Sequence, residues 1–406
     1  MDNRNRSVRS HSDTEAFQYG FSRDVTRKNN NKRKTKQLNH KKIRVVGGVI
    51  AALLGILVGL SLFVVWYKDY LLNQITYVNT DPNQAATIID ENGDVVALSD
   101  LTDATKFGYK QDTPIKNFLL IGIDSRSKNY SKTEKGDRSD VIVVMSIDSD
   151  KGTIKLISIA RDSYAYFPGY SKPHKINASM SYGGPTLLQA TVESVLRIKI
   201  DGYAYVNFSN MAKIIDAVGG VYVNMSDGER KVANQYIREL SKSAELIYDT
   251  GKETWLNGTQ AVAYARVRYV GNGDYERMER QVEVLRSLLN QYMKLSATKK
   301  LACMDDVLSS IVTNIDKKDV EKYALDFLPS LKKAEMQYIQ FPIEGTLNQG
   351  TYGGEWSMRV NWNALIPYMQ EFFYGERYDF DPVKIPPKAP ELSECKTDIP
   401  LEKLIH

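Results

Sequence analysis

The stretch Val141-Ile-Val-Val-Met-Ser-Ile-Asp-Ser-Asp-Lys-Gly-Thr-Ile-Lys-Leu-Ile-Ser-Ile-Ala160 decides the fold of this chain. It contains two short, almost continuously apolar runs, 141–147 and 154–160, and a third run of the same kind, 117–123, precedes it. Such runs are typical of strands that are buried on both faces. Because these strands need helices above and below them, the sequence predicts a layered α/β/α domain around a central mixed sheet.

Helical patterns elsewhere in the chain supply the outer layers of this domain. Apolar residues recur there at helical spacing, and shorter apolar segments between them read as additional strands. We expect helices at 186–198, 209–218, 276–293, 302–315, 318–331 and 361–373, and strands at 203–208, 221–224, 263–269 and 336–341.

A membrane anchor is expected before this domain. Residues 45–66 contain no charged side chain, and as a helix of roughly 33 Å they would cross a hydrocarbon core about 30 Å thick. Residues 1–44 hold 13 Lys and Arg against 4 Asp and Glu, so the positive-inside rule places them in the cytoplasm. A cleaved signal peptide is the alternative, but its apolar core would be only about 7 to 15 residues long. We therefore expect one transmembrane helix and a single-pass, type II cell-membrane protein whose larger part is extracytoplasmic.

Composition divides the chain into five segments. We expect a basic, disordered cytoplasmic tail at 1–44, a transmembrane signal anchor at 45–66, a stalk at 67–113, the main domain at 114–375 and an extended C-terminal tail at 376–406. The last assignment follows from the closely spaced prolines between residues 382 and 390.

Several kinds of chemistry find no support in the sequence. Cys303 and Cys395 lie far apart, which leaves a disulfide and two free thiols equally open, and none of the four histidines has zinc-binding spacing. Neither Gly-x-x-x-x-Gly-Lys-Ser/Thr, nor Gly-x-Gly-x-x-Gly after a strand, nor a Gly-x-Ser-x-Gly elbow occurs. The cytoplasmic tail has no helix-turn-helix pattern, so no nucleic-acid partner is expected. The substrate should therefore bring its own activated phosphate.

Two aspartates flank adjacent apolar runs. Asp124 directly follows one run and Asp140 directly precedes the next, so both would emerge at one end of the sheet if the strands are antiparallel. Taken singly, each could be an ordinary strand-end cap. The neighbouring Arg126, Arg138 and Arg161 favour a magnesium-phosphate site instead, since Mg²⁺ (or Mn²⁺) binds a few carboxylates and completes its shell with water and phosphate oxygens.

A second pair of cations lies in the run Tyr264-Ala-Arg-Val-Arg-Tyr269. On a strand, Arg266 and Arg268 would point to one face about 7 Å apart. Their repulsion would be on the order of 2 kcal/mol at an effective dielectric of about 20, so an anion between them is the simplest explanation.

Further candidates lie on a loop and on a helix. Lys175 and Asn177 alternate in the loop after Arg161 and Asp162, and we expect both to face the site, although an exposed loop is the alternative for Lys175. On the helix, Arg277 and Gln281 are four residues apart and share a face. Arg280, by contrast, pairs with Glu276 at the same spacing and is given a structural role.

Taken in order, these blocks resemble the LytR-CpsA-Psr family. The resemblance rests on Leu119-Leu-Ile-Gly-Ile-Asp124-Ser-Arg126, Arg138-Ser-Asp140, Ile157-Ser-Ile-Ala-Arg161-Asp162-Ser, Lys175-Ile-Asn177-Ala, Ile215-Asp-Ala-Val-Gly219-Gly220-Val, Leu256-Asn-Gly258-Thr-Gln260 through Arg268, and Asp274 through Gln281. It covers roughly residues 114–300 closely and extends loosely to about 375.

The resemblance implies an anchored protein of a Gram-positive-type envelope. Its outward α/β domain would hold a polyprenyl pyrophosphate in an apolar groove and move a glycopolymer, such as a teichoic acid or capsular polysaccharide, onto peptidoglycan. By matching position, Asp124 and Asp140 would hold magnesium. The pyrophosphate would be contacted by Arg138, Arg161, Arg266, Arg268, Arg277 and Gln281.

These considerations define the expected site. A muramic acid hydroxyl would attack the sugar-proximal phosphorus, with Asp162 or a substrate phosphate oxygen as the base. We assign catalytic roles to Arg138, Arg161, Asp162, Arg266 and Arg268, and substrate binding to Arg126, Lys175, Asn177, Arg277 and Gln281. The remaining alternatives are a polyprenyl pyrophosphate-glycan pyrophosphatase, a non-catalytic lipid-linked glycan-binding protein and a transcriptional attenuator, the last of which would need a cytoplasmic DNA-reading domain.

Overall fold

The computed structural model describes residues 62–78, 87–97, 114–124, 137–240, 243–271, 273–323 and 335–406. Its internal contacts divide the chain into two units, Met1–Tyr70 and Leu71–His406. Residues 62–70 of the first unit are helical. Among the described residues, no helix combines the length and the apolar character needed to cross a membrane. The tail expected at 1–44 and residues 45–61 of the expected anchor lie outside the described residues.

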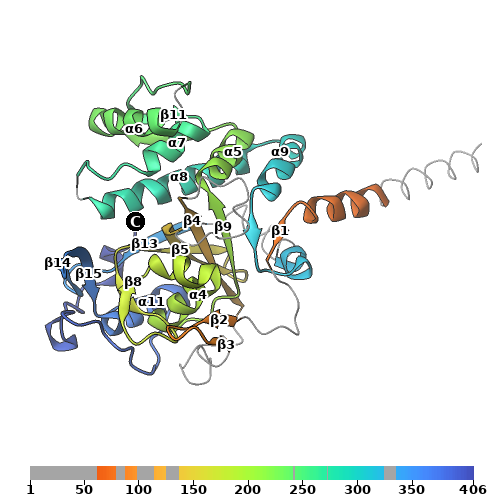
Figure 1. Cartoon of the computed structure of the whole chain (residues 1–406). Helices are drawn as coiled ribbons and strands as arrows, with labels where there is room; N and C mark the ends of the chain where they lie inside the picture. The colour runs from red at the N-terminus through yellow and green to blue at the C-terminus, as the bar shows by residue number, and fades with distance from the viewer. Residues whose placement is uncertain are drawn as a thin grey trace, which may run out of the picture. The chain divides into compact units, whose positions relative to one another are not determined.

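A mixed sheet forms the centre of the second unit, and in the described residues it has seven strands (Figure 1). In order across the sheet they are β1 (Thr76–Tyr77), β12 (Val312–Thr313), β9 (Gly202–Asn207), β4 (Ile115–Ile123), β5 (Ser139–Asp148), β6 (Thr153–Ile159) and β13 (Glu335–Phe341). The strands β4, β5 and β6 contain the three apolar runs and pair antiparallel. Because β9 pairs with β4 and β13 with β6 in parallel, the predicted mixed sheet is confirmed.

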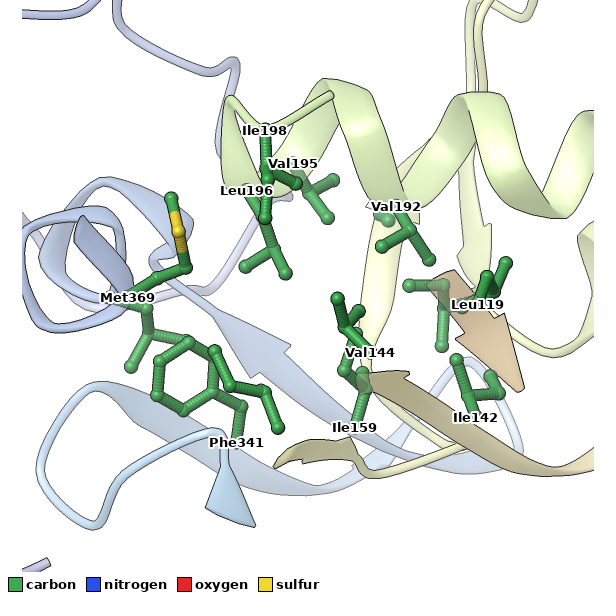
Figure 2. Close-up of a cluster of buried hydrophobic side chains, with 14 of the residues drawn as sticks. Leu119, Ile142, Val144, Ile159, Val192, Val195, Leu196, Ile198, Phe341 and Met369 are labelled. Carbon is green, nitrogen blue, oxygen red and sulfur yellow. The ribbon is translucent and has the colours of Figure 1, made fainter. Parts of the chain in front are cut away.

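Helices cover both faces of this sheet. The helices α4 (Ala178–Leu196) and α11 (Ile366–Tyr374) lie on one face, where side chains such as Leu119, Val144 and Val192 share a buried cluster (Figure 2). On the other face, α8 (Asp274–Lys294) packs Val282 against Val143. Neighbouring residues of β5 thus point into opposite cores, which explains why the run 141–147 is almost continuously apolar. The layered α/β/α arrangement is confirmed.

A second hydrophobic cluster forms beside α8. It is built from the helices α5 (Phe208–Val218), α6 (Asp227–Leu240) and α7 (Gly258–Ala265) and the antiparallel ribbon of β10 (Val221–Met225) and β11 (Gly251–Leu256). The following helix α9 (Ala297–Ser309) packs against α5. This cluster gives the α8 side of the sheet a second wall.

Two predicted elements are wrong. Residues 263–269 do not form a strand, because α7 occupies most of that segment and ends at Ala265. A capping box starts this helix: the Asn257 side chain accepts a hydrogen bond from the Gln260 backbone, and the Gln260 side chain accepts one from the Asn257 backbone. The helix expected at 302–315 ends at Ser309, after which the chain enters β12.

Short strands complete the unit. The hairpin of β14 (Leu347–Tyr352) and β15 (Glu355–Val360) contacts the ribbon of β7 (Tyr164–Tyr166) and β8 (Pro173–Lys175), and β2 (Thr87–Ile89) pairs with β3 (Val95–Ala97). The backbone N–H of Met358 in β15 donates to the carbonyl of Asp162, 3.0 Å away. The hairpin is thereby fixed to the segment that follows β6.

Residues 376–406 pack on the domain. They contain the single-turn 3-10 helices η2 (Leu392–Glu394) and η3 (Leu401–Lys403), and they accept hydrogen bonds from Arg197 at Asp381 and from Asn361 at Pro390. The backbone of His406 exchanges two hydrogen bonds with that of Tyr338 in β13. This segment is extended but held by the fold.

Candidate functional site

The two strand-end aspartates lie at the same end of the sheet. Asp124 follows β4 and Asp140 is the second residue of β5, and the antiparallel register sets Ile123 opposite Ser139. Asp124 is exposed and Asp140 is partly buried. Both line one cavity, so the sheet geometry brings together the carboxylates that the sequence predicts as a pair.

This cavity has a volume of about 510 Å³ and lies between the sheet and the helices α5, α7 and α8. Its walls are mostly apolar. They include Leu120, Val143, Val206, Ile214, Val262, Leu285 and Leu288. Its charged and amide lining lies at or near strand ends, at and after the end of α7, and in the first half of α8: Asp124, Asp140, Arg161, Asn207, Arg266, Arg268, Arg277 and Gln281. The arrangement is an apolar hollow with a charged end.

Arg161 follows β6 and forms an ion pair with Asp140. Burial opposes the charged form, but the adjacent Asp140, assisted by Asp162, raises the pKa of Arg161 above its ordinary value. The Nε of Arg161 lies 3.8 Å from Asp162 and is buried without a hydrogen-bond partner. Arg161 is therefore a fixed cation whose Nε–H group has no hydrogen-bond acceptor.

Arg266 is the C-cap residue of α7, not part of a strand. Its guanidinium carbon lies 4.9 Å from the ring centre of Phe208 and 5.0 Å from that of Tyr236. These aromatic contacts hold the cation without neutralising it. Its Nη1 is buried and has no hydrogen-bond partner. The predicted gathering of cations thus occurs, but through a helix end instead of a strand face.

Arg268 lies two residues beyond the same helix end and interacts with acids from two other segments. Its Nη2 is 3.4 Å from an Asp162 oxygen, and its Nε is 3.6 Å from Asp274. Its guanidinium carbon is 6.0 Å from the ring centre of Trp356. Arg268 therefore links the cavity to the β14–β15 hairpin.

Arg277 and Gln281 lie one turn apart on α8, and both line the cavity. Arg277 is 2.7 Å from Asp274, and only 5% of it is exposed. Burial lowers the pKa of Arg277 below its ordinary value, although Asp274 counteracts this effect. Its Nε is buried without a partner, while Gln281 donates to the carbonyl of Ala265 at 3.4 Å.

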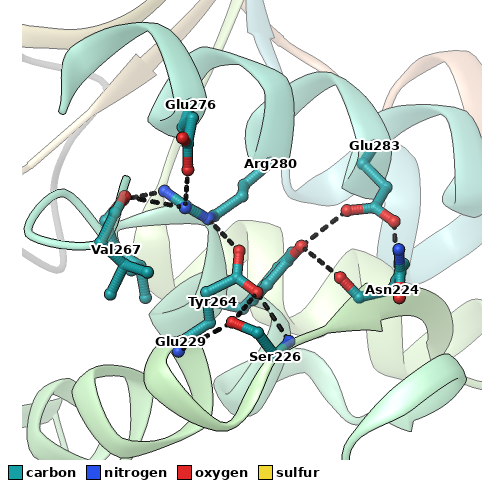
Figure 3. A network of polar contacts seen from close by, with 9 residues as sticks. Asn224, Ser226, Glu229, Tyr264, Val267, Glu276, Arg280 and Glu283 are labelled. Atoms are coloured by element: carbon teal, nitrogen blue, oxygen red, sulfur yellow. Dashed lines mark hydrogen bonds and ion pairs between the residues drawn. The ribbon is translucent and has the colours of Figure 1, made fainter. Parts of the chain in front are cut away.

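Arg280 does not line this cavity and belongs to a separate polar network (Figure 3). It contacts Glu229 at 2.6 Å and Glu276 at 2.7 Å, and it donates to the carbonyl oxygens of Val267 and Val270. The pairing with Glu276 is the one predicted from the sequence. Arg280 thus holds the backbone of the loop between α7 and α8 in place.

Asp162 is buried among cations. Its Oδ1 lies 3.0 Å from Nζ of Lys175, and its Oδ2 faces Arg268. Lys175 also contacts Glu355 at 3.2 Å, and the Tyr164 hydroxyl donates to the other Glu355 oxygen at 2.8 Å. Burial opposes the charged form of Glu355, but the hydrogen bonds from Tyr164 and Lys175 hold its pKa below the ordinary value.

Some predicted residues do not line the cavity. Arg138 is exposed and lies outside the cavity lining, as do Lys175 and Asn177. Asn177 precedes α4, and its Oδ1 is buried without a partner. Arg126 lies outside the described residues. Glu355 is a neighbour of the site that the sequence analysis does not single out: the Gly353-Gly354 pair indicates the hairpin turn before it but not its contact with Lys175.

The site can accommodate a hard divalent cation only with help from a ligand. In the described part of the chain, no three side chains of His, Cys, Asp or Glu gather closely enough to hold a metal ion. Asp124 and Asp140 are two carboxylates beside the arginines that line the cavity, and such a pair suits Mg²⁺ because this ion completes its shell with waters and ligand oxygens. The residues present therefore fit this ion. Cys303 and Cys395 are free thiols.

A sequence model described as the LytR_cpsA_psr family matches residues 78–365, which is more than half of the chain. The chain belongs to the LytR-CpsA-Psr family. The resemblance found in the sequence blocks is confirmed. All residues that line the cavity fall within the matched range, so the cavity is part of the LytR-CpsA-Psr domain.

Curated relatives from Enterococcus and Staphylococcus are similar to this LytR-CpsA-Psr protein. The polyisoprenyl-teichoic acid–peptidoglycan teichoic acid transferase TagU of Enterococcus faecalis is 31% identical over 224 residues, 55% of this chain and 69% of TagU. The regulatory protein MsrR of Staphylococcus aureus strain COL is 30% identical over 270 residues, 64% of this chain and 76% of MsrR.

Solved structures share the fold. TagT bound to LIIa-WTA has a TM-score of 0.51 and 26% identity, covering 65% of this chain and 94% of TagT. Protein gbs0355 from Streptococcus agalactiae has a TM-score of 0.56 at 22% identity, covering 72% and 95% of the two chains, and supports the fold alone.

Proposed function

We propose that this LytR-CpsA-Psr protein transfers a glycopolymer of the teichoic acid or capsular polysaccharide type from a polyprenyl pyrophosphate carrier to peptidoglycan. One observation carries the proposal: the apolar cavity of about 510 Å³ ends in the guanidinium groups of Arg161, Arg266, Arg268 and Arg277. In a polyprenyl pyrophosphate, the long apolar chain matches the apolar walls and the pyrophosphate head group matches the guanidinium groups. The transferase name of TagU and the ligand in the TagT structure support the same class of substrate.

The apolar walls suit a prenyl chain. Burying apolar surface stabilises a complex by roughly 25 cal/mol per Å², so a chain that fills such a hollow contributes most of the binding free energy. It also fixes the position of the head group. The charged end then needs to orient the phosphates, not to supply the whole affinity.

Unsatisfied donors at the charged end favour an anion. Nη1 of Arg266 and Nε of Arg277 are buried without hydrogen-bond partners. A buried donor left without a partner costs about 1–3 kcal/mol, and phosphate oxygens are strong acceptors that would remove this cost. Arg266 is the clearest case, because its neighbours Phe208 and Tyr236 contribute no negative charge.

The proposed reaction is a phosphotransfer. An acceptor hydroxyl of peptidoglycan forms a bond to the sugar-proximal phosphorus, the bond to the bridging oxygen breaks, and the prenyl phosphate leaves. The arginines stabilise charge on the bridging and non-bridging oxygens as that bond breaks. The hydroxyl proton passes to Asp162 or to a substrate phosphate oxygen. Asp162 is fixed for this role by Lys175 and Arg268.

A divalent cation completes the proposed site. Asp124 and Asp140 would hold Mg²⁺ or Mn²⁺, which neutralises phosphate charge when it is bound. Most of the arginines already face carboxylates, as Arg161 faces Asp140 and Arg277 faces Asp274. An additional cation would therefore offset the repulsion between these acids and the incoming phosphates.

The location of both substrates follows from the expected anchor. With residues 45–66 in the cell membrane and residues 1–44 in the cytoplasm, the domain would work outside the cell membrane, where the lipid-linked polymer meets peptidoglycan. Residues 67–113 would then serve as the stalk.

Transfer assays with single-site variants test the proposal. We expect Arg268→Ala to reduce transfer from a polyprenyl pyrophosphate-linked glycopolymer to peptidoglycan by at least about 100-fold, since an electrostatic donor to the transition state is lost. The matched control is Arg230→Ala on α6: this arginine also pairs with an aspartate, Asp227, but lies outside the cavity lining. Its activity should stay at the wild-type level, and circular dichroism should show both variants folded.

Other outcomes would identify a different activity. Release of polymer phosphate without acceptor would indicate a pyrophosphatase. Tight donor binding with no turnover, even with acceptor and Mg²⁺ present, would indicate a lipid-binding carrier. Full transfer by Arg268→Ala would contradict the assignment of the charged end as the reaction centre.

A further inference from the structure

The β14–β15 hairpin presents an aromatic ring and a carboxylate beside the charged end. Gly353 and Gly354 have φ values of 61° and 85°, and together they form a two-residue turn of the tight kind that follows the twist of the strands. Tyr352 and Glu355 pair directly across this turn. Because Met358 also bonds to the carbonyl of Asp162, the tip of the hairpin has a fixed position relative to the site.

Trp356 lies next to the cavity but does not line it. The residue remains 37% exposed, and its ring centre is 6.0 Å from the guanidinium carbon of Arg268, which does line the cavity. An exposed tryptophan face beside a charged cleft is a surface on which the C–H face of a sugar ring can pack.

Glu355 adds polar capacity to the same surface. Its side chain is 47% exposed, although Lys175 and Tyr164 hold both carboxylate oxygens in place. A carboxylate oxygen has more than one acceptor position, so sugar hydroxyls can still donate to Glu355 from the solvent side. Aromatic packing and a preoriented acceptor together provide the two elements of a saccharide site.

The direction of attack on phosphorus decides whether the donor sugar or the acceptor sugar would occupy this surface. This inference rests on the proposed function. In phosphoryl transfer the attacking and leaving oxygens lie roughly in line with phosphorus. The leaving oxygen belongs to the prenyl phosphate, whose chain points into the apolar cavity. The attacking oxygen must then arrive from the side opposite the cavity, beyond Arg268, where Trp356 and Glu355 lie.

We propose that Trp356 and Glu355 form a saccharide subsite that holds the glycan strand of the acceptor next to the phosphorus. Trp356 packs on a sugar ring, and Glu355 accepts hydrogen bonds from its hydroxyls. Through Lys175, Glu355 is connected to Asp162, so an acceptor bound here lies next to the candidate base.

Kinetics of Trp356→Ala in the full-length protein test this subsite. We expect the KM for uncrosslinked peptidoglycan glycan strands to rise about tenfold, as the loss of one aromatic contact predicts. The KM for the lipid donor should not change. Trp356→Phe should restore most of the acceptor affinity. The matched control is Trp255→Ala, which removes an exposed tryptophan from the antiparallel strand β11, outside the cavity lining.

Calorimetric titration of the same variants with glycan strands alone separates the two proposals. If the wild-type protein transfers polymer but Trp356→Ala keeps its acceptor KM and its glycan binding, the subsite is wrong and the proposed function stands. A rise in the donor KM instead would assign the surface to the donor sugar and overturn the proposal. If the wild-type protein shows no transfer, the proposed function fails. In that case, loss of glycan binding in Trp356→Ala would still support a saccharide site at Trp356. Equal glycan binding by the wild type and Trp356→Ala would refute the saccharide site.

Discussion

Arg277 and Arg280 are two buried arginines on one helix that have different roles. They are three residues apart on α8, and both are almost fully buried. Arg277 has one close carboxylate and an unpaired Nε beside the cavity. Arg280 has two carboxylates and two carbonyl oxygens. The complete set of partners identifies the structural residue, and the incomplete set identifies the candidate ligand-binding one.

Arg280→Met should therefore reduce stability. Removing the cation leaves Glu229 and Glu276 without their partner in a largely buried network, which costs about 3–5 kcal/mol. We expect urea denaturation to give a free energy of unfolding lower by that amount. The remaining folded protein should bind a polyprenyl pyrophosphate donor with unchanged affinity; a loss of donor binding in the folded fraction would contradict the structural role.

Glu193 on α4 predicts a pH dependence of stability. It is buried, accepts hydrogen bonds from the backbone of Ile200 and the side chain of Gln189, and burial raises its pKa from an ordinary 4.5 to about 7. Between these values the folded state keeps the proton and the unfolded state loses it. The contribution of Glu193 is thus fully present below pH 4.5 and falls, by about 3 kcal/mol in all, as the pH rises through 7.

Urea denaturation at pH 5 and pH 8 checks this dependence. In Glu193→Gln, which remains neutral and can keep the hydrogen bond from Ile200, the loss of stability between the two pH values should be smaller than in the wild type by most of that amount. Glu239→Gln, at an exposed position of α6, should leave the wild-type dependence intact. Equal pH slopes in all three proteins would refute the shifted pKa.

Individual site residues were predictable where local geometry decided them. Asp124 and Asp140 follow from two buried strands, and Arg277 and Gln281 follow from helical spacing. Glu355 could not be found in this way, because it lies 180 residues from the Lys175 that it contacts and no local pattern connects the two.

At the scale of elements, the start of α7 controls one wall of the cavity. A Cβ added at Gly258 would overlap the carbonyl oxygen of Ala212 on α5, so the two helices approach closely only because this residue is glycine. Both helices line the cavity, through Ile214 of α5 and Val262 of α7 among others.

Gly258→Ala should push these helices apart. We expect a destabilisation of about 1–3 kcal/mol, as is typical of overpacking, together with weaker binding of a polyprenyl phosphate probe. Thermal unfolding and fluorescence titration with that probe measure the two effects. Gly375→Ala serves as the control for losing a glycine, since Gly375 has open space around it and lies at the end of α11. It should destabilise by its strained φ alone and leave binding unchanged.

The same helix shows why one element was mispredicted. Tyr264, Val267 and Tyr269 resemble a strand when they are read for β propensity, and the alternation of Arg266 and Arg268 strengthens that interpretation. The capping box between Asn257 and Gln260 overrides it, because it satisfies the first free backbone N–H groups and starts a helix there. Arg266 and Arg268 both line the cavity, but from the end of a helix and the residues after it and not from a strand.

At the scale of the whole molecule, the layered fold was predictable and the assembly of the site was only partly so. Three apolar runs define the middle of the sheet, and this pattern is local. The site combines the ends of β4, β5 and β6 with the end of α7, the start of α8 and a hairpin near residue 355. Such long-range convergence depends on packing, which the sequence pattern does not encode directly.

The pairing of His406 with Tyr338 has a consequence for behaviour in concentrated solution. In the described sheet β13 is an edge strand. Without a partner, the outer N–H and C=O groups of its backbone would be available to pair with an extended segment of another molecule. Exposed strand borders of this kind nucleate self-association. Because the backbone of His406 pairs with Tyr338, part of this edge is already hydrogen-bonded, and we expect this pairing to reduce aggregation.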